Sequence, residues 1–452
     1  MYSREEVKTI VDRILNMAKA DAVEVDFNGG ERSATRFANS TITANMVQFD
    51  RQVSVSVHQG DKVGSASTRQ FDDDSLKEMV ANATAAAERA RETPDMLPLI
   101  EGPQAYLEVD AALPSSVNFG PAERAKLARQ SIDVSDRMKT VGSGYIPKNH
   151  QTTCSANSKG LFAYYQYAET SFILTCRTAD GAGSGWAGIT GVKDPAMINA
   201  EELTRIASDK ALKSRGARAL EPGRYTVVLE PRANARFLSL MTGLFNAQAA
   251  ESAFGRNYFT GEEPGTTKVG VKVFSEALTL KSDVGNPILR QSPIGPDGMA
   301  AKPVTWVEKG VLKQLAYSRQ YARRLKKEPT PATINTSLVM EGTETSIDEM
   351  IKSTRRGLLI TFFWYIRGVD QQTLLNTGMT RDGLFLIENG QIAGPVQNFR
   401  WNMSPIVGYN NVTAVGTPVP IHTGEAYDGP GTALVPPVRI EDFLMTSVSP
   451  AV

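Results

Sequence analysis

Histidine and cysteine are scarce in this sequence, and their scarcity limits the chemistry that the chain can offer. Of 452 residues, 3 are histidines and 2 are cysteines. Two cysteines are too few for a disulfide framework, and Cys154 and Cys176 do not form a C-x-x-C pair. We therefore expect free thiols and few candidates for zinc ligands.

Net charge and long apolar runs are also missing. Lysine and arginine together number 49, as do aspartate and glutamate, so no long-range field gathers phosphates or anionic lipid. This balance argues against nucleic acid as a partner. No stretch reaches the ~18 apolar residues of a membrane span, and the first residues form no apolar signal region. We expect a cytoplasmic protein without membrane contact.

Common catalytic signatures are absent as well. The sequence has no G-x-S-x-G elbow, no Walker loop and no G-x-G-x-x-G turn between a strand and a helix. Serine hydrolases, nucleotide hydrolases and dinucleotide enzymes therefore lose their usual sequence support. The run Gly181–Gly185 lacks the Lys-Ser/Thr helix start of a phosphate loop, and it predicts a hairpin connection.

Helical and strand periodicities alternate along the part of the chain that precedes a break at 218–223. An amphipathic helix begins after Ser3 and ends near Ala20, and a period of two from residue 22 to 69 predicts antiparallel strands. We expect turns at Asn28-Gly29-Gly30 and at Gln59-Gly60-Asp61. Ser75 with Glu78 opens a second helix.

A similar order of elements follows the proline-rich loop at 93–103, and the chain after the break is mostly β. Pro121 leads a helix to about Met138, strands fill 141–191, and a helix covers 199–214. We predict an α+β fold: helix and antiparallel-sheet domains at 1–105 and 106–218, then a C-terminal domain at 219–452 with a sandwich- or barrel-like sheet.

Several co-linear segments resemble the TldD/PmbA family, also known as peptidase family U62 or the modulator of DNA gyrase family. The first is Thr35–Ile42, followed by the strand at Val53 and by Gly64-Ser65-Ala66-Ser67. The others are Pro222–Glu230 and Gly383–Gly390, and the last continues into 395–400. The family's best known pair is a heterodimeric zinc peptidase that processes peptides in the cytosol, and the resemblance implies its fold.

The zinc motif of the catalytic members is missing. In those members the helix that follows the strand corresponding to Tyr225–Leu229 of this chain carries H-E-x-x-x-H, and a C-terminal cysteine supplies a further zinc ligand. Here the corresponding helix, Pro231–Met241, has no histidine, and 425–448 has no cysteine. The resemblance thus implies the PmbA (TldE) branch: a non-catalytic subunit without a metal site that pairs with a zinc-bearing TldD-like chain, or with itself. On this helix Asn234 and Leu238 have the i, i+4 spacing of two zinc ligands, and we expect histidines placed there to bind zinc weakly and to restore no proteolysis.

The histidines themselves suggest little chemistry. His58 is expected to be a solvated strand residue and His150 a polar loop residue. His422 is the one near carboxylates, with Glu425 and Asp428, and these three residues are weak candidates for an autonomous hydrolase in which the imidazole is a general base. A protein-binding regulator of the gyrase-modulator type is a further alternative.

The strongest candidates for peptide binding lie in two neighbouring aromatic and polar stretches, 364–370 and 376–382. Tyr365, Arg367, Thr380 and Arg381 could form the wall of a groove for an extended or unfolded peptide, through edge-strand hydrogen bonds and capture of a carboxylate by arginine. The resemblance places the substrate cleft nearby. An ordinary hairpin, in which Arg367 and Asp370 pair with neighbours, explains the same residues equally well.

Overall fold

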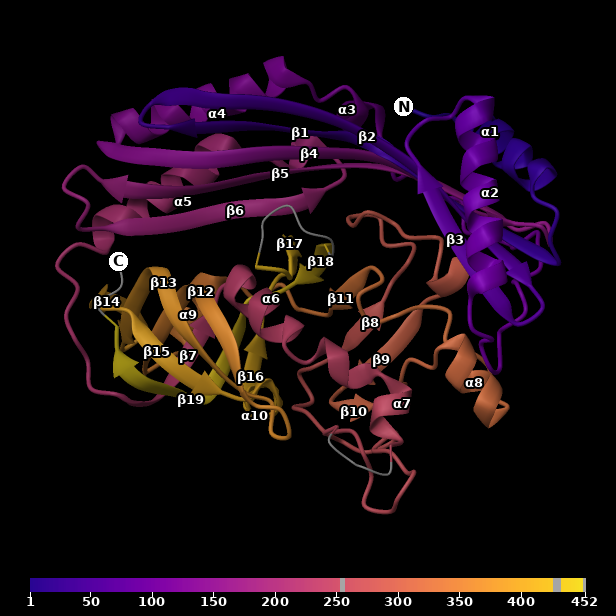
Figure 1. The fold of residues 1–452 in the computed structure, drawn as a ribbon. Coiled ribbons are helices and arrows are strands. Elements are labelled where there is room, and N and C mark those ends of the chain that lie inside the picture. The colour runs from indigo at the N-terminus through magenta and orange to yellow at the C-terminus, as the bar shows by residue number, and fades with distance from the viewer. Residues whose placement is uncertain (253–256, 426–431, 450–452) are drawn as a thin grey trace.

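A long antiparallel sheet arches over a C-terminal part that is built on two further sheets (Figure 1). The computed structural model describes residues 1–252, 257–425 and 432–449. The predicted α+β class is confirmed, and so is the barrel-like sheet near the C-terminus.

The long sheet has six strands in the order β3-β2-β1-β4-β5-β6. The strands are β1 (Ala22–Ala38), β2 (Thr41–Gln59), β3 (Lys62–Thr68), β4 (Thr140–Asn157), β5 (Phe162–Thr178) and β6 (Ser184–Val192). β1 has 17 residues and is therefore about 55 Å long at ~3.3 Å per residue. Because β1 pairs with β4, the segments 1–105 and 106–218 contribute strands to one sheet. The Gly181–Gly185 run lies at the predicted hairpin between β5 and β6.

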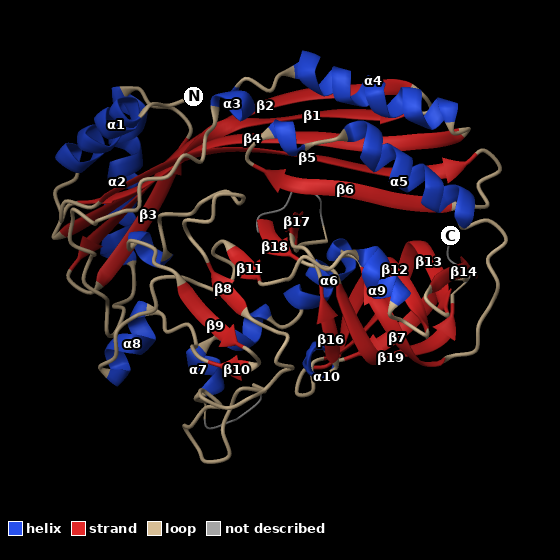
Figure 2. Cartoon of the chain, turned by 180° about the vertical axis from the view of Figure 1, so that it is seen from behind, coloured by secondary structure: helices blue, strands red, loops and turns tan. Residues whose placement is uncertain are grey.

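Helices cover the two ends of this sheet, each over its own apolar cluster. α1 (Arg4–Met17) and α2 (Asp73–Arg89) pack at one end on valines of β1 and β2. α4 (Pro121–Arg137) and α5 (Ala200–Lys213) pack at the other end, on the face turned away from the C-terminal part (Figure 2). Between them lie the short helix α3 (Pro114–Val117) and the turn η1 (Pro195–Met197).

Two local predictions in this region were wrong. Asn28-Gly29-Gly30 is not a turn, because all three residues continue β1. A Cβ on Gly30 would lie 2.3 Å from the carbonyl oxygen of His150, so glycine is needed there for the close approach of β4. The second helix begins earlier than expected, since the side chain of Asp72 caps it by accepting from the Ser75 amide.

The C-terminal part contains a closed ring of strands. β7 (Gly223–Leu229) pairs with β12 (Arg356–Asp370) and β19 (Val438–Val448), and the ring closes through β15 (Phe399–Met403) and β13 (Leu375–Glu388), which returns to β12. β14 (Gln391–Pro395) and β16 (Val412–Val415) extend it. Interlocking aromatic rings fill its interior, among them Phe237, Phe363, Trp401 and Phe443, with centroids 4.9–6.3 Å apart.

The third sheet lies beside this barrel, with the order β10-β9-β8-β11-β18-β17. Its strands are short: β8 (Leu280–Ser282), β9 (Val304–Glu308), β10 (Val311–Leu312), β11 (Leu338–Met340), β17 (Val419–His422) and β18 (Thr432–Val435). The remaining elements are α6 (Pro231–Ser239), η2 (Thr242–Phe245), α7 (Ala247–Ala250), η3 (Pro296–Gly298), α8 (Arg319–Leu325), α9 (Ile347–Lys352) and α10 (Pro405–Asn410).

The long sheet and the barrel share one apolar interior. Trp186 of β6 belongs to the barrel's core cluster, and its ring lies 5.8 Å from that of Phe362 in β12. The inner face of the long sheet is therefore fixed against β12. In the described part of the chain, no helix is both long and apolar enough to cross a membrane.

Candidate functional site

Helix α6 occupies the centre of the molecule, between the long sheet and the barrel (Figure 1). Pro231 in its first turn suits a helix start, and all residues from Arg232 to Leu238 are buried. The preceding Glu230 does not cap the helix with its side chain. Its carboxylate instead accepts from Lys210 Nζ at 2.7 Å and from Thr361 Oγ1 at 3.2 Å, which ties α5 and β12 to the start of α6.

One face of α6 carries two buried arginines that hold the segment 422–425. Arg232 is 1% exposed and donates to the carbonyl oxygens of His422 and Glu425, while its guanidinium lies 5.1 Å from the ring centroid of Phe362. Arg236 donates to the Thr423 carbonyl at 3.1 Å, and a further nitrogen lies 3.7 Å from the Glu425 carboxylate. Burial lowers the pKa of Arg236, which Glu425 opposes.

The opposite face of α6 belongs to the core. Asn234 donates to the Pro436 carbonyl at 2.8 Å and accepts from the Tyr409 hydroxyl at 2.7 Å, and Leu238 is 0% exposed. The i, i+4 pair that we selected from the sequence, Asn234 and Leu238, therefore faces away from the 422–425 segment. The pair that faces it is Arg232 and Arg236.

These side chains do not fit a zinc ion. A zinc site needs neutral imidazole, thiolate or carboxylate donors, whereas the face of α6 towards 422–425 presents two guanidinium groups, which have no lone pair to donate and repel a cation. Among the described residues, no group of three or more His, Cys, Asp and Glu side chains is arranged to hold a metal.

The hydrolase candidates are only partly brought together. His422 ends strand β17 and is 2% exposed; its amide donates to Thr190 Oγ1 at 2.6 Å, and its Nε2 lies 3.4 Å from Thr432 Oγ1. It is therefore a buried residue at the end of a strand. The Glu425 carboxylate is directed to Arg236, and Asp428 lies outside the described residues.

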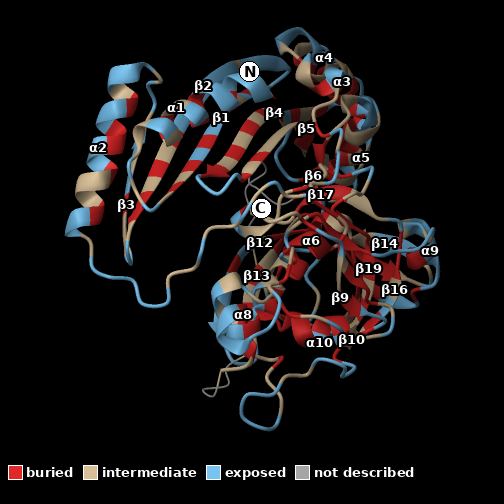
Figure 3. Ribbon diagram, turned by 90° about the vertical axis from the view of Figure 1, so that its right-hand side faces the viewer, coloured by how far each residue is buried: buried red, intermediate tan, exposed pale blue. Residues whose placement is uncertain are grey.

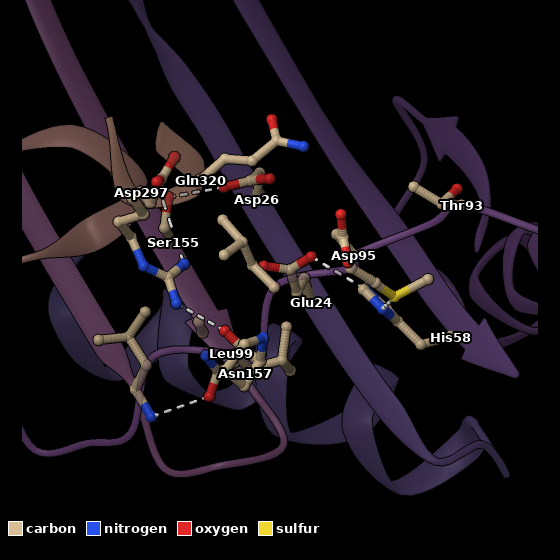
Figure 4. Close-up of a pocket in the computed structure, with 16 residues that line it drawn as sticks. Glu24, Asp26, His58, Thr93, Asp95, Leu99, Ser155, Asn157, Asp297 and Gln320 are labelled. Carbon is tan, nitrogen blue, oxygen red and sulfur yellow. Dashed lines mark hydrogen bonds and ion pairs between the residues drawn. The ribbon is translucent and has the colours of Figure 1, made fainter. Parts of the chain in front are cut away.

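The other two histidines lie in the long sheet. His58 is in a strand as expected, but its side chain is buried and not solvated, and His150 lies in a strand and not in the expected loop. His58 is buried in β2, with Nε2 3.0 Å from Glu24 and Nδ1 3.2 Å from Met96 Sδ. It lines a pocket of about 490 Å³ between the long sheet and the loop at 93–99 (Figure 4). His150 is in the middle of β4 and 4% exposed, and burial is the largest cause that lowers its pKa to about 4.

The four predicted peptide-binding residues divide between two environments. Tyr365 is 48% exposed, and the guanidinium of Arg367 lies 4.4 Å from its ring centroid at the open end of β12. Thr380 is buried instead, where its hydroxyl bonds to Asn398 and to the Phe399 amide.

Arg381 lies on the other side of β13 from Thr380. The register pairs Thr380 with Phe363 and Arg381 with Phe362, and opposite residues in an antiparallel pair share a face. The guanidinium of Arg381 lies 5.2 Å from the ring centroid of Trp364, at 3.4 Å from the Asp382 carboxylate. Tyr365 and Arg367 thus form one exposed unit, whereas Arg381 lies half-buried beside Trp364 and Asp382, and Thr380 is buried.

A polar pocket at the end of α6 was not predicted from the sequence. It has a volume of about 360 Å³ and is lined by Ser239, Thr242, Arg290, Ser292, Asn335, Ser337, Thr423, Gly424 and Thr432. Arg290 lies 3.5 Å from Glu169 and 4.0 Å from the ring centroid of Tyr167, so β5 of the long sheet positions it. These residues come from separate stretches of sequence, and the only local signal is the high density of hydroxyl side chains.

Two family models match the sequence. The model described as "PmbA/TldA metallopeptidase C-terminal domain" matches residues 222–447, and the model described as "PmbA/TldA metallopeptidase domain 1" matches residues 23–87. The chain belongs to the TldD/PmbA family.

A curated relative of this TldD/PmbA-family chain is a protein of Methanothermobacter thermautotrophicus named "Metalloprotease". The two are 25% identical over 282 residues, which cover 58% of this chain and 59% of the relative. The chain thus spans about three-fifths of the length of the curated relative that it matches.

Solved structures share the fold over nearly the whole chain. A Thermotoga maritima protein named as a modulator of a DNA gyrase superposes with a TM-score of 0.80 at 18% identity, covering 97% of this chain and 99% of that one. TldE from Thermococcus kodakarensis gives 0.80 at 16% identity, with 98% and 100% covered. A Bacteroides thetaiotaomicron protein, also named as a modulator of DNA gyrase, gives 0.79 at 17% identity, with 99% and 100% covered.

Proposed function

We propose that this chain is a non-catalytic subunit of a TldD-type zinc metalloprotease complex that processes peptides in the cytosol. The observation that carries the proposal is the chemistry of α6. On the helix that the resemblance matches to the zinc-bearing helix of catalytic family members, Arg232 and Arg236 use their guanidinium groups to fix the backbone of 422–425. The helix therefore has a structural task that a pair of metal ligands at the same positions would remove.

The partner in this proposal is a zinc-bearing TldD-like chain, with self-association as the alternative arrangement. The zinc and the general base would come from the partner, and this chain would add surface for an extended or unfolded peptide. Tyr365 with Arg367 is the part best suited to that task, because both side chains are exposed and the arginine can pair with a carboxylate.

An autonomous hydrolase at His422 has less support. The imidazole is buried, and the Glu425 carboxylate is directed to Arg236 and not to the ring. A regulator of the gyrase-modulator type rests only on the names of relatives, and the neutral charge balance offers no electrostatic case for DNA.

Co-purification from the native host tests the proposal. We expect a chain that carries H-E-x-x-x-H to be recovered with this one, and we expect the recovered complex to cleave unfolded peptides in a zinc-dependent way. Recovery of this chain without any such partner, together with zinc-dependent peptidase activity of this chain alone, would overturn it.

Peptide contact is tested separately in the reconstituted complex. Substituting Arg367→Ala should raise the KM for an unfolded peptide several-fold with kcat little changed, because it removes a binding contact. Thr380→Val serves as a comparison, since Thr380 is buried and its loss should lower stability and leave KM unchanged. An unchanged KM for Arg367→Ala would remove this residue from the peptide-binding surface.

A further inference from the structure

The polar pocket at the end of α6 is lined almost entirely by hydrogen-bonding side chains. Its walls come from α6 and η2, from the loops at 290–292 and 335–337, and from the segment at 423–424 with Thr432 of β18. It lies beside α6 and β17, which Figure 3 shows among the buried elements between the long sheet and the barrel. Six of the nine lining residues are serine or threonine, and none of the nine is aromatic or aliphatic. Such a lining favours a polar ligand over an apolar one.

The charge that faces this pocket is positive. Among the described residues, Arg290 is the single charged residue of the lining, and no aspartate or glutamate belongs to it. Glu169 of β5 lies 3.5 Å from the Arg290 guanidinium and neutralises part of its charge. A guanidinium has five N–H donors, and one carboxylate together with the Tyr167 ring does not use all of them. A partly compensated cation among neutral donors suits a singly charged anion better than a dianion.

Contacts outside the pocket hold its donors in place. The Tyr165 hydroxyl of β5 bonds to the carbonyl of Gln291, which is next to Arg290 in the chain. Arg236 donates to the carbonyl of Thr423 at 3.1 Å and so fixes that wall. Because these elements are already held, a ligand can bind with little reordering of the pocket.

Ser337 gives the clearest indication of a ligand. It lines the pocket and is 5% exposed, yet its hydroxyl has no hydrogen-bond partner among the described residues. Its φ of +46° lies in the left-handed region, which residues with a side chain rarely adopt. Buried hydroxyls nearly always have a partner, and strained backbone is concentrated at ligand sites. A ligand that accepts a hydrogen bond would satisfy the Ser337 hydroxyl.

We propose that this pocket binds the C-terminal carboxylate of a peptide. The Arg290 guanidinium pairs with the carboxylate, and the Ser337 hydroxyl donates a hydrogen bond to it. The volume of about 360 Å³ is far larger than the ~30 Å³ of a water molecule and falls in the ~300–1,000 Å³ range of ligand pockets, so the pocket holds a terminal residue and not only a bare ion. Because the lining is small and polar, we expect a small or polar C-terminal residue. The inference deepens the proposed function, on which it rests for the choice of a peptide as ligand.

Isothermal titration calorimetry of the purified chain tests the proposal with three probes at one ionic strength. The probes are an N-acetylated peptide of three glycines and a C-terminal serine, the same peptide with a C-terminal amide, and inorganic phosphate. We expect one free-acid peptide to bind per chain. The amide should bind at least about tenfold more weakly, because it cannot form the charge-assisted pair with Arg290. Phosphate should also bind more weakly, because it leaves most of the pocket unfilled.

Two variants assign the binding to this pocket. Ser337→Ala removes a hydroxyl that bonds to no described residue, so it should weaken binding several-fold and leave the urea midpoint unchanged. Arg290→Lys keeps a positive charge beside Glu169 but loses the paired N–H donors, so it should weaken binding roughly tenfold. As a matched control, Arg205→Lys alters another arginine that pairs with a glutamate, Glu202, outside the pocket, and the affinity should not change.

Equal affinities for the free acid and the amide, no binding of either peptide, or phosphate binding as tight as that of the free acid would overturn the inference. Unchanged affinity in the Ser337→Ala variant would also overturn it, even if Arg290→Lys does not fold. These measurements need no zinc-bearing chain. Failure of the pocket to select the free acid, with a zinc-bearing chain still recovered from the native host, would overturn this inference alone. Recovery without such a chain bears on the proposed function and not on the pocket.

Discussion

Arginine side chains fix the backbone around α6, and each acts on residues far away in the sequence. The donors Arg232 and Arg236 are about 190 positions from the carbonyls of His422, Thr423 and Glu425 that they bond. A buried guanidinium is stable only while its hydrogen bonds are made, and the carbonyls are likewise costly to bury without a donor.

Replacing Arg232 should therefore cost stability. Arg232→Ala leaves the carbonyls of His422 and Glu425 without this donor and removes the contact with Phe362, so we expect the free energy of unfolding to fall by roughly 2–4 kcal/mol. Arg205→Ala removes an exposed pair with Glu202 and should change it by less than about 0.5 kcal/mol. Urea unfolding of the three proteins gives both values. Equal losses for the two variants would contradict the structural role of Arg232.

The pKa of His150 makes a pH-dependent prediction. Burial, assisted by Lys148, lowers it from 6.5 to about 4 in the folded chain. Between these two pH values the unfolded chain binds a proton that the folded chain does not, so stability falls as the pH drops through this window and levels off below about pH 4. The variant His150→Gln should lose less stability over the same window. Parallel urea midpoints for the two proteins across the window would contradict the burial of a neutral imidazole.

At the residue scale, the sequence shows which residue types are absent but does not show which side chains are buried. The absence of histidine from α6 can be seen in the sequence itself. The burial of His58 and His150 cannot be seen there, because the polar neighbours of each suggested solvent, while the covering groups, such as Met96 over His58, come from a distant loop. The tasks of Arg232 and Arg236 were invisible for the same reason, since a local pattern cannot identify a partner that is distant in the chain.

At the scale of elements, α6 shows how one helix can present two different faces. Histidines at Arg232 and Arg236 would face the 422–425 segment, whereas histidines at Asn234 and Leu238 would enter the core. We expect the first pair to bind zinc weakly without peptidase activity, since a third ligand and a general base are missing. The second pair should mainly destabilise the fold, by roughly 2–5 kcal/mol for the loss of Leu238 packing.

Zinc titration and denaturant unfolding of both double variants distinguish these outcomes. Tight zinc binding together with peptide cleavage by the Arg232→His/Arg236→His variant would reveal a latent site and contradict the non-catalytic assignment. Zinc binding by the Asn234→His/Leu238→His variant as tight as that of the Arg232→His/Arg236→His variant would contradict the assignment of faces to α6.

Most elements were predictable where local signals agree with the final fold. Pro121 began α4 as expected, and Asn199 caps α5 through its side chain. The turn predicted at Asn28-Gly29-Gly30 is not present. These residues continue β1, and glycine at position 30 allows β4 to approach closely. The sequence predicted a sandwich- or barrel-like sheet but not which strands pair. The ring closes where β12 pairs with β13, and sequence periodicity does not specify such pairings.

At the scale of the whole molecule, the long sheet and the barrel meet over α6. Trp186, Phe362 and the Lys210–Glu230 ion pair join the two parts there, so the helix is held rigidly from both sides. The central claim is that this shared centre is a scaffold and not a metal centre.

Metal analysis combined with a peptidase assay on the purified chain tests that claim most directly. The chain should be loaded with excess zinc, dialysed, and assayed for bound metal and for cleavage of an unfolded peptide. We expect far less than one zinc per chain and no cleavage that a chelator abolishes, because α6 offers guanidinium groups where imidazoles would be required. One tightly bound zinc per chain, with cleavage that is lost on chelation and regained with zinc, would contradict the account.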